Sequence, residues 1–79
     1  MNIYLLEQND NMGYDTYDSC VVTANSEEEA RQIRPGSKDW KIEWHSTWCN
    51  TPDKVIVTLL GKAKPNSKEG IIMSSYNAG

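Results

Sequence analysis

The sequence predicts a single α+β domain over residues 1–79, in which one antiparallel sheet of four or five strands carries one short helix on one face, in the order β-β-α-β-β-β. Two observations support this. Short runs rich in β-branched residues alternate with turn sequences, and only one segment has helix start and stop signals. The chain has 79 residues, 38% hydrophobic and 24% charged, which suits one small core.

The first two strands are predicted at 2–8 and 19–24. The run IYLL is too continuous for a one-sided strand and too short for a helix, and SCVVTA is rich in β-branched residues. The sequence NDNMG between them is typical of a turn, in which Gly13 is expected to adopt a positive φ. The two strands should therefore pair as an antiparallel hairpin.

A helix is predicted over residues 26–34. Ser26 and Glu29 fit a capping box, in which each side chain accepts a hydrogen bond from the backbone N–H of the other residue. Glutamates in the first turn and Arg31 and Arg34 in the last turn match the helix dipole, and a Pro-Gly pair ends the helix.

The second half of the chain is predicted to supply three strands. WKIEW at 40–44 alternates apolar and charged residues with the period of a strand. A loop then leads to KVIVTLL at 54–60. The turn KPNSKEG at 64–70 precedes a final strand, GIIMSSY, at 70–76.

Acidic and basic residues are segregated along the chain. Residues 1–30 contain seven acids and no Lys or Arg, and the remainder has eight basic residues against four acids, for a net charge of −3. No basic stripe is present, so duplex nucleic acid is not an expected partner. Nor does the sequence suggest a membrane span or a signal peptide, and we expect a cytoplasmic protein with Cys20 and Cys49 as free thiols.

Catalytic and metal-binding patterns are weak. The single histidine, His45, leaves little choice of base, and Cys49 lies four residues away in a loop pattern rather than a helix. The cysteines and histidine show no recognised zinc-ligand spacing, and the five glycines are dispersed instead of forming a phosphate loop. We therefore expect a non-enzymatic protein without a metal or cofactor.

Two polar and aromatic segments are candidates for binding. GYDTYDS at 13–19 contains two Tyr-Asp pairs, and the terminal SSYNAG has similar chemistry. Tyrosines can stack or donate, and carboxylates can accept from sugar hydroxyls or exocyclic amines. A turn whose tyrosines cover the sheet edge is the alternative. If the last strand neighbours the hairpin, the two segments form one site.

Tryptophans and arginines complete the candidate site. Trp40, Trp44 and Trp48 recur every four residues and should cluster on a helix or a strand, either as core or as surface anchors. Arg31 and Arg34 can hold a phosphate. The predicted ligand-binding residues are Tyr14, Asp15, Tyr17, Asp18, Arg31, Arg34, Trp44, Trp48, Tyr76 and Asn77.

The pattern G-Y-D-x-Y-D-S-x-V-V-x-A-x-S-E-E-E-A-R at 13–31, followed by Trp40 and a Y-N-A-G terminus, resembles a set of small phage and prophage proteins. The resemblance covers 13–31, Trp40 and 70–79. It implies a context, because small phage proteins of this kind often inhibit bacterial antiphage defence. Some sequester a nucleotide immune signal, as sponge proteins do, and others occlude a protein surface, as anti-CRISPR proteins do.

We expect sequestration of a cyclic nucleotide or cyclic ADP-ribose type signal, in the cytoplasm of the bacterial host. A protomer this small cannot enclose such a ligand, so the pocket should lie at a subunit interface of a homo-oligomer, with Arg31, Arg34 or a neighbouring subunit meeting the phosphate. The alternative is an anti-CRISPR-type protein that covers a Cas effector with its acidic and aromatic face. A phage structural or regulatory protein without a defence role is a second alternative.

Overall fold

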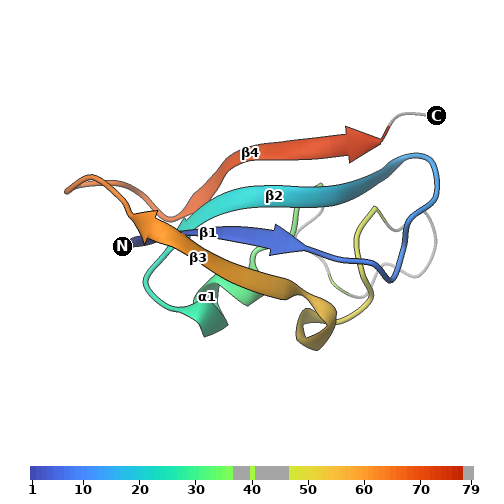
Figure 1. Ribbon diagram of the computed structural model, residues 1–79, viewed down its shortest axis with the longest axis horizontal. Helices are drawn as coiled ribbons and strands as arrows, with labels where there is room; N and C mark the ends of the chain where they lie inside the picture. Colours follow the sequence, from blue (N-terminus) through green and yellow to red (C-terminus); the bar gives the residue numbers. More distant parts are fainter. Residues whose placement is uncertain (37–39, 41–46, 78–79) are drawn as a thin grey trace.

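The computed structural model describes residues 1–36, 40 and 47–77, and its fold is α+β, as predicted (Figure 1). One antiparallel sheet has the strand order β3-β1-β2-β4, so β3 and β4 are its two edges. The described elements are β1 (Asn2–Glu7), β2 (Thr16–Ala24), α1 (Glu27–Gln32), the 3₁₀ helix η1 (Pro52–Lys54), β3 (Ile56–Lys62) and β4 (Gly70–Asn77). Most of the predicted strand 40–44 lies outside the described residues.

β1 and β2 form the predicted antiparallel hairpin, with Asn2 opposite Ala24 at one end of the register. The prediction of a positive φ at Gly13 is wrong. Asp15 instead adopts the left-handed conformation, with φ of 60°. Aspartate tolerates this backbone better than most residues, because its short side chain bonds locally to the main chain. The chain therefore reverses direction closer to the start of β2 than expected.

Gln8 holds the connection between β1 and β2. Gln8 is only 3% exposed. Its Nε2 donates to the carbonyls of Asn11 at 2.6 Å and Tyr17 at 2.9 Å. Its Oε1 accepts from the N–H groups of Asp10 at 2.9 Å and Asn11 at 2.7 Å. Because all four partners are main-chain groups, this buried amide fixes the path of the loop that leads to Tyr14.

The helix α1 begins after the predicted cap, Ser26, whose Oγ accepts from the N–H of Glu29 at 3.2 Å. The other half of the predicted capping box differs, because the Glu29 carboxylate accepts from the N–H of Asn25 at 3.4 Å. The helix ends at Gln32, two residues earlier than predicted. A proline follows Arg34 and disfavours helical backbone there, and the preceding residue is already extended.

The core lies on one face of the sheet, beneath α1 and residues 47–55 (Figure 1). The buried apolar side chains are those of Tyr4, Leu6, Cys20, Val22, Ala24, Ala30, Trp48, Cys49 and Val55. Large apolar side chains on both edge strands remain exposed, namely Ile56, Leu59 and Leu60 on β3 and Ile71, Ile72 and Met73 on β4. The core is therefore centred on β1 and β2, and the two edges are only partly covered.

The connection between β3 and β4 carries the chain from one edge of the sheet to the other (Figure 1). The N–H of Ala63 donates to the carbonyl of Met1 at 3.0 Å, and Thr23 Oγ1 donates to the carbonyl of Lys68. Residues 63–69 thus cross the ends of β1 and β2. This crossing brings the first residues of β4 close to the end of α1.

Candidate functional site

The pairing of β2 with β4 brings the two polar and aromatic segments together. Tyr17 lies directly opposite Tyr76. The N–H of Asp15 donates to the carbonyl of Asn77 at 2.6 Å, and the Asn77 amide donates to the carbonyl of Gly13 at 3.3 Å. The adjacency on which the predicted site depended is therefore present, and the two segments form one continuous surface.

Two tyrosine rings lie at the centre of this surface. The rings of Tyr17 and Tyr76 pack edge to face, with their centroids 4.8 Å apart and their planes at 61°. Tyr17 is half-buried against the core, whereas Tyr76 is 46% exposed and Tyr14 is 78% exposed. We call this surface the tyrosine patch and define it as Tyr14, Asp15, Tyr17, Tyr76 and Asn77. An exposed ring held by a neighbouring ring provides a stacking platform.

The patch is polar as well as aromatic. Partial desolvation raises the pKa of the Tyr76 phenol, and the negative charge of Asp15 and a hydrogen bond to its carboxylate raise that pKa further. The phenol therefore remains a neutral donor at physiological pH. Asp18 lies next to the patch, where its carboxylate is exposed and accepts from the Ser19 hydroxyl at 3.2 Å. The patch thus offers phenol donors and carboxylate acceptors, but no positive charge.

The two arginines that we expected to meet a phosphate contact other groups of the chain, and Arg31 Nη2 lies 3.2 Å from the Glu27 carboxylate. Arg31 Nη1 donates to the carbonyls of Pro52, at 3.2 Å, and Val55. Arg34 is 6% exposed, and its guanidinium lies 5.7 Å from the centroid of the Trp40 ring, in a cation–π arrangement. Both charges are engaged with other parts of the chain, so we remove both residues from the candidate site.

Trp48 is a core residue and not a surface anchor. It is 0% exposed and belongs to the same buried cluster as Leu6 and Val22. In a chain without phenylalanine, its ring is the largest fully buried side chain. A ring in this position cannot stack on a ligand, which corrects the expectation for Trp48. The expected contribution of Trp44 lies outside the described residues.

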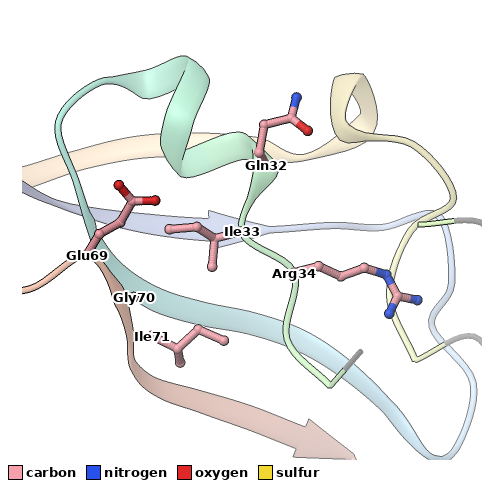
Figure 2. Close-up of a pocket in the computed structure, with 6 residues that line it drawn as sticks. All are labelled: Gln32, Ile33, Arg34, Glu69, Gly70 and Ile71. Atoms are coloured by element: carbon pink, nitrogen blue, oxygen red, sulfur yellow. The ribbon is translucent and has the colours of Figure 1, made fainter. Parts of the chain in front are cut away.

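A cleft of about 400 Å³, which the sequence did not indicate, lies between the end of α1 and the start of β4 (Figure 2). Ile33 and Ile71 form apolar walls, and the polar groups of Gln32 and Glu69 lie at its rim. The Arg34 guanidinium extends away from the two isoleucines. We call this the α1–β4 cleft, and its lining residues are Gln32, Ile33, Arg34, Glu69, Gly70 and Ile71. The only sequence signal for it was the apolar Ile-Ile pair that opens the last strand.

A second hollow, of about 470 Å³, lies under the crossing connection and is bordered by Ile3 and Thr23 of the central strands. Lys64 and Lys68 line it from the connection, together with Ser67. These lysines bring positive charge to the end of β4 that is farthest from the tyrosine patch. The sequence pattern had identified this segment only as a turn.

The thiols have the properties of buried structural groups. Burial raises the pKa of Cys20 to about 12, and burial together with the charge of Asp10 raises the pKa of Cys49. Both thiols are therefore protonated near neutral pH, a state that disfavours nucleophilic attack. Within the described ranges, no three His, Cys, Asp or Glu side chains are grouped so that they can hold a metal ion. His45, whose pairing with Cys49 was considered above, lies outside the described residues.

Comparison with protein-family models, with curated proteins and with solved structures finds no match for this chain. Over the part of the chain that the structure describes, no helix is long and apolar enough to cross a membrane.

Proposed function

We propose that the protein is a non-enzymatic binding protein that sequesters a nucleotide-type immune signal, and that the tyrosine patch contacts the base or the ribose. The observation behind this proposal is the Tyr17–Tyr76 ring pair, in which Tyr76 is exposed, with the Asp15 carboxylate beside it. Base stacking on an aromatic side chain contributes about 1–3 kcal/mol per base. A carboxylate beside the ring can accept from an exocyclic amine or a sugar hydroxyl, which adds directional recognition.

The biological context of the proposal is a phage-type inhibitor of antiphage defence in the bacterial cytoplasm. It rests on the resemblance carried by residues 13–31 and 70–79. Sequestration requires no catalytic group, and the patch supplies aromatic faces, donors and acceptors.

The phosphate of such a ligand needs a cation that the patch itself lacks. Because Arg31 and Arg34 contact other groups of the chain, we assign this role to the lysines of the crossing connection, Lys64 and Lys68. They lie beyond the Gly70 end of β4, whereas the patch lies at the Asn77 end. An eight-residue strand spans about 25 Å, so one protomer does not bring both groups to one small ligand. The proposal therefore requires a second subunit.

One observation favours a different function, occlusion of a Cas effector surface. The exposed end of the hairpin combines Tyr14 with the carboxylates of Asp15 and Asp18. Such a surface complements a positively charged groove that binds nucleic acid.

A thermal-shift screen against cyclic dinucleotides and cyclic ADP-ribose isomers separates the two functions. A ligand at 100 times its Kd should add about 2.7 kcal/mol to the free energy of unfolding, which raises Tm by roughly 10–20 °C in a domain of this size. Tyr76→Ala should abolish the shift, and Met12→Ala, at an exposed position outside the patch, should retain it. The ligand should be recovered intact after denaturation.

Two results would overturn the sequestration proposal. If no nucleotide shifts Tm and the protein co-purifies with a Cas subunit, the occlusion function replaces it. If the ligand is recovered cleaved, the protein is an enzyme.

A further inference from the structure

β4 is an edge strand without the charged residues and prolines that usually prevent edge strands from pairing with other chains. Figure 1 shows it along one margin of the sheet, with no described element beyond it. Four of its side chains are large and exposed: Ile71 by 44%, Ile72 by 55%, Met73 by 64% and Tyr76 by 46%. This edge thus combines main-chain groups that pair with no other described strand and an apolar surface.

We propose that two copies of the chain pair along β4, antiparallel, about a two-fold axis near Ser74. Such an interface uses the same strand from both copies, which closes the assembly as a dimer. The four exposed side chains present on the order of 450 Å² per copy, or about 900 Å² in two copies, which is the upper limit of the area they can bury; a specific interface needs roughly 1,000 Å². Main-chain hydrogen bonds between the two strands add to this.

The other edge of the sheet is less suited to this pairing. β3 ends at Lys62, whereas no residue of β4 is charged. A lysine on an edge strand opposes pairing with another chain, because its charge would have to be desolvated at the new interface. Pairing along β4 brings no like charges together among the residues of the strand. The charge pattern therefore selects β4.

The dimer also completes the ligand site, a consequence that rests on the proposed function. With the axis near Ser74, Tyr76 lies opposite Ile71 and Ile72 of the partner, where the register of β4 shifts by one residue. Tyr76 and Ile71 are both on the core side of the sheet, because they pair with Tyr17 and Val22. The tyrosine patch of one copy therefore adjoins the α1–β4 cleft of the other.

In this arrangement the tyrosine patch of one copy and the α1–β4 cleft of the other contribute different groups to one site. The cleft contributes the apolar walls of Ile33 and Ile71 and the hydrogen-bonding groups of Gln32 and Glu69, whereas the patch contributes the aromatic face. Lys68, which immediately precedes Glu69, brings positive charge to the same end of the partner. The chemistry fits a purine nucleotide, with its base between Tyr76 and the cleft and its phosphate toward the lysines.

A disulfide cross-link tests the pairing without any ligand. Residues 71 and 76 of one chain are about 16 Å apart along the strand, beyond the roughly 7 Å Cα separation that a disulfide allows. In the proposed dimer they face each other across the interface. The double variant Ile71→Cys/Tyr76→Cys should therefore give a covalent dimer under mild oxidation, whereas either single variant should not. The native thiols of Cys20 and Cys49 are buried and should not react.

The matched control places cysteines on the other edge, in Ile56→Cys/Leu60→Cys, and should remain monomeric on a non-reducing gel. A folded Ile71→Cys/Tyr76→Cys protein, checked by circular dichroism, that fails to cross-link would overturn the proposal. Equal cross-linking through β3 would overturn it too.

Sedimentation velocity provides a second test. The unmodified chain should sediment as a dimer at high concentration, and Met73→Lys should weaken dimerisation at least tenfold. Leu60→Lys, a similarly exposed position on β3, should leave it unchanged. A chain that stays monomeric at all concentrations, or a dimer that Leu60→Lys weakens as much, would contradict the pairing. A dimer that binds no nucleotide would leave the pairing intact and contradict only the proposed function.

Discussion

The residues that the sequence groups into one candidate site divide into two regions with opposite environments. Trp48 and Arg34 are buried, and the partly exposed Arg31 donates to the carbonyls of Pro52 and Val55. Tyr14, in the turn before β2, and Tyr76, near the end of β4, remain at the surface. The side chains in both regions are of types suited to ligand binding. The two regions therefore differ in their position in the fold and not in their chemistry, because only the residues near α1 are packed against the core.

The largest expected effect tests the region near α1. Trp48→Ala should lower the free energy of unfolding by about 3–5 kcal/mol, because it removes the largest fully buried ring and leaves a cavity. Tyr14→Ala should change it by no more than about 0.5 kcal/mol, because that side chain is 78% exposed. Urea denaturation of both variants measures the contrast. Similar losses in the two variants would show that the division is wrong.

Arg31 provides a smaller test of the same region. Arg31→Met should lower the free energy of unfolding by about 1–3 kcal/mol, because the main-chain carbonyls of Pro52 and Val55 lose a charged donor. Glu27→Gln is the matched control. It removes the ion pair with Arg31, a 3.2 Å contact that is worth about 0.2–0.5 kcal/mol on a helix surface, together with one of the three negative charges that favour the first helical turn. If Arg31→Met unfolds like the unmodified chain and loses ligand binding instead, Arg31 belongs to the site after all.

The surface region has its own structural requirement at Asp15. Its φ of 60° is costly for a side chain with a Cβ and no local bonding, so Asp15→Ala should lower the free energy of unfolding by about 1–2 kcal/mol. Asp15→Gly should be close to neutral, since glycine adopts this backbone freely. Thermal denaturation of the two variants distinguishes them. An equal loss in both would mean that the carboxylate, and not the backbone, stabilises the turn.

Local signals in the sequence were enough to predict most of the fold. The hairpin, the two edge strands and the cap at Ser26 follow from periodicity and capping chemistry, which act over a few residues. The second strand begins at Thr16, three residues earlier than predicted, and most of the strand predicted at 40–44 lies outside the described residues. The end of the helix and the left-handed residue were predicted less accurately. The helix ends early because the proline after Arg34 disfavours helical backbone before it. The left-handed conformation could fall on any of several residues of the turn, and Asp15 adopts it instead of Gly13.

The candidate site was predictable only in part, because it depends on long-range pairing. The chemistry of the tyrosine patch was predictable from its residues, but the position of β4 beside β2 depends on the crossing connection and on the hydrogen bond from Thr23 to the carbonyl of Lys68. The α1–β4 cleft has the same origin, since residues 32–34 and 69–71 are far apart in the chain. The contacts of Arg31 likewise require η1 to lie against the helix, which no local pattern specifies.

The smallest expected effect tests whether the patch is an electrostatic unit. The Asp15 charge and hydrogen bond help to raise the pKa of Tyr76 above the ordinary value of 10.0, so Asp15→Asn should lower that pKa. Ultraviolet absorbance of tyrosinate between about pH 9 and 12, with the Tyr76→Phe titration subtracted, measures the pKa of Tyr76.

A raised pKa of Tyr76 means that the folded chain holds this proton more tightly than the unfolded chain. Its contribution to stability is therefore full below the unfolded pKa and is lost as the pH rises through the folded pKa. The alkaline loss of stability should then be smaller in Asp15→Asn than in the unmodified chain. An unchanged Tyr76 titration would mean that Asp15 and Tyr76 lie close together without interacting electrostatically. The patch would then lack the carboxylate–phenol pair on which directional recognition of a base depends.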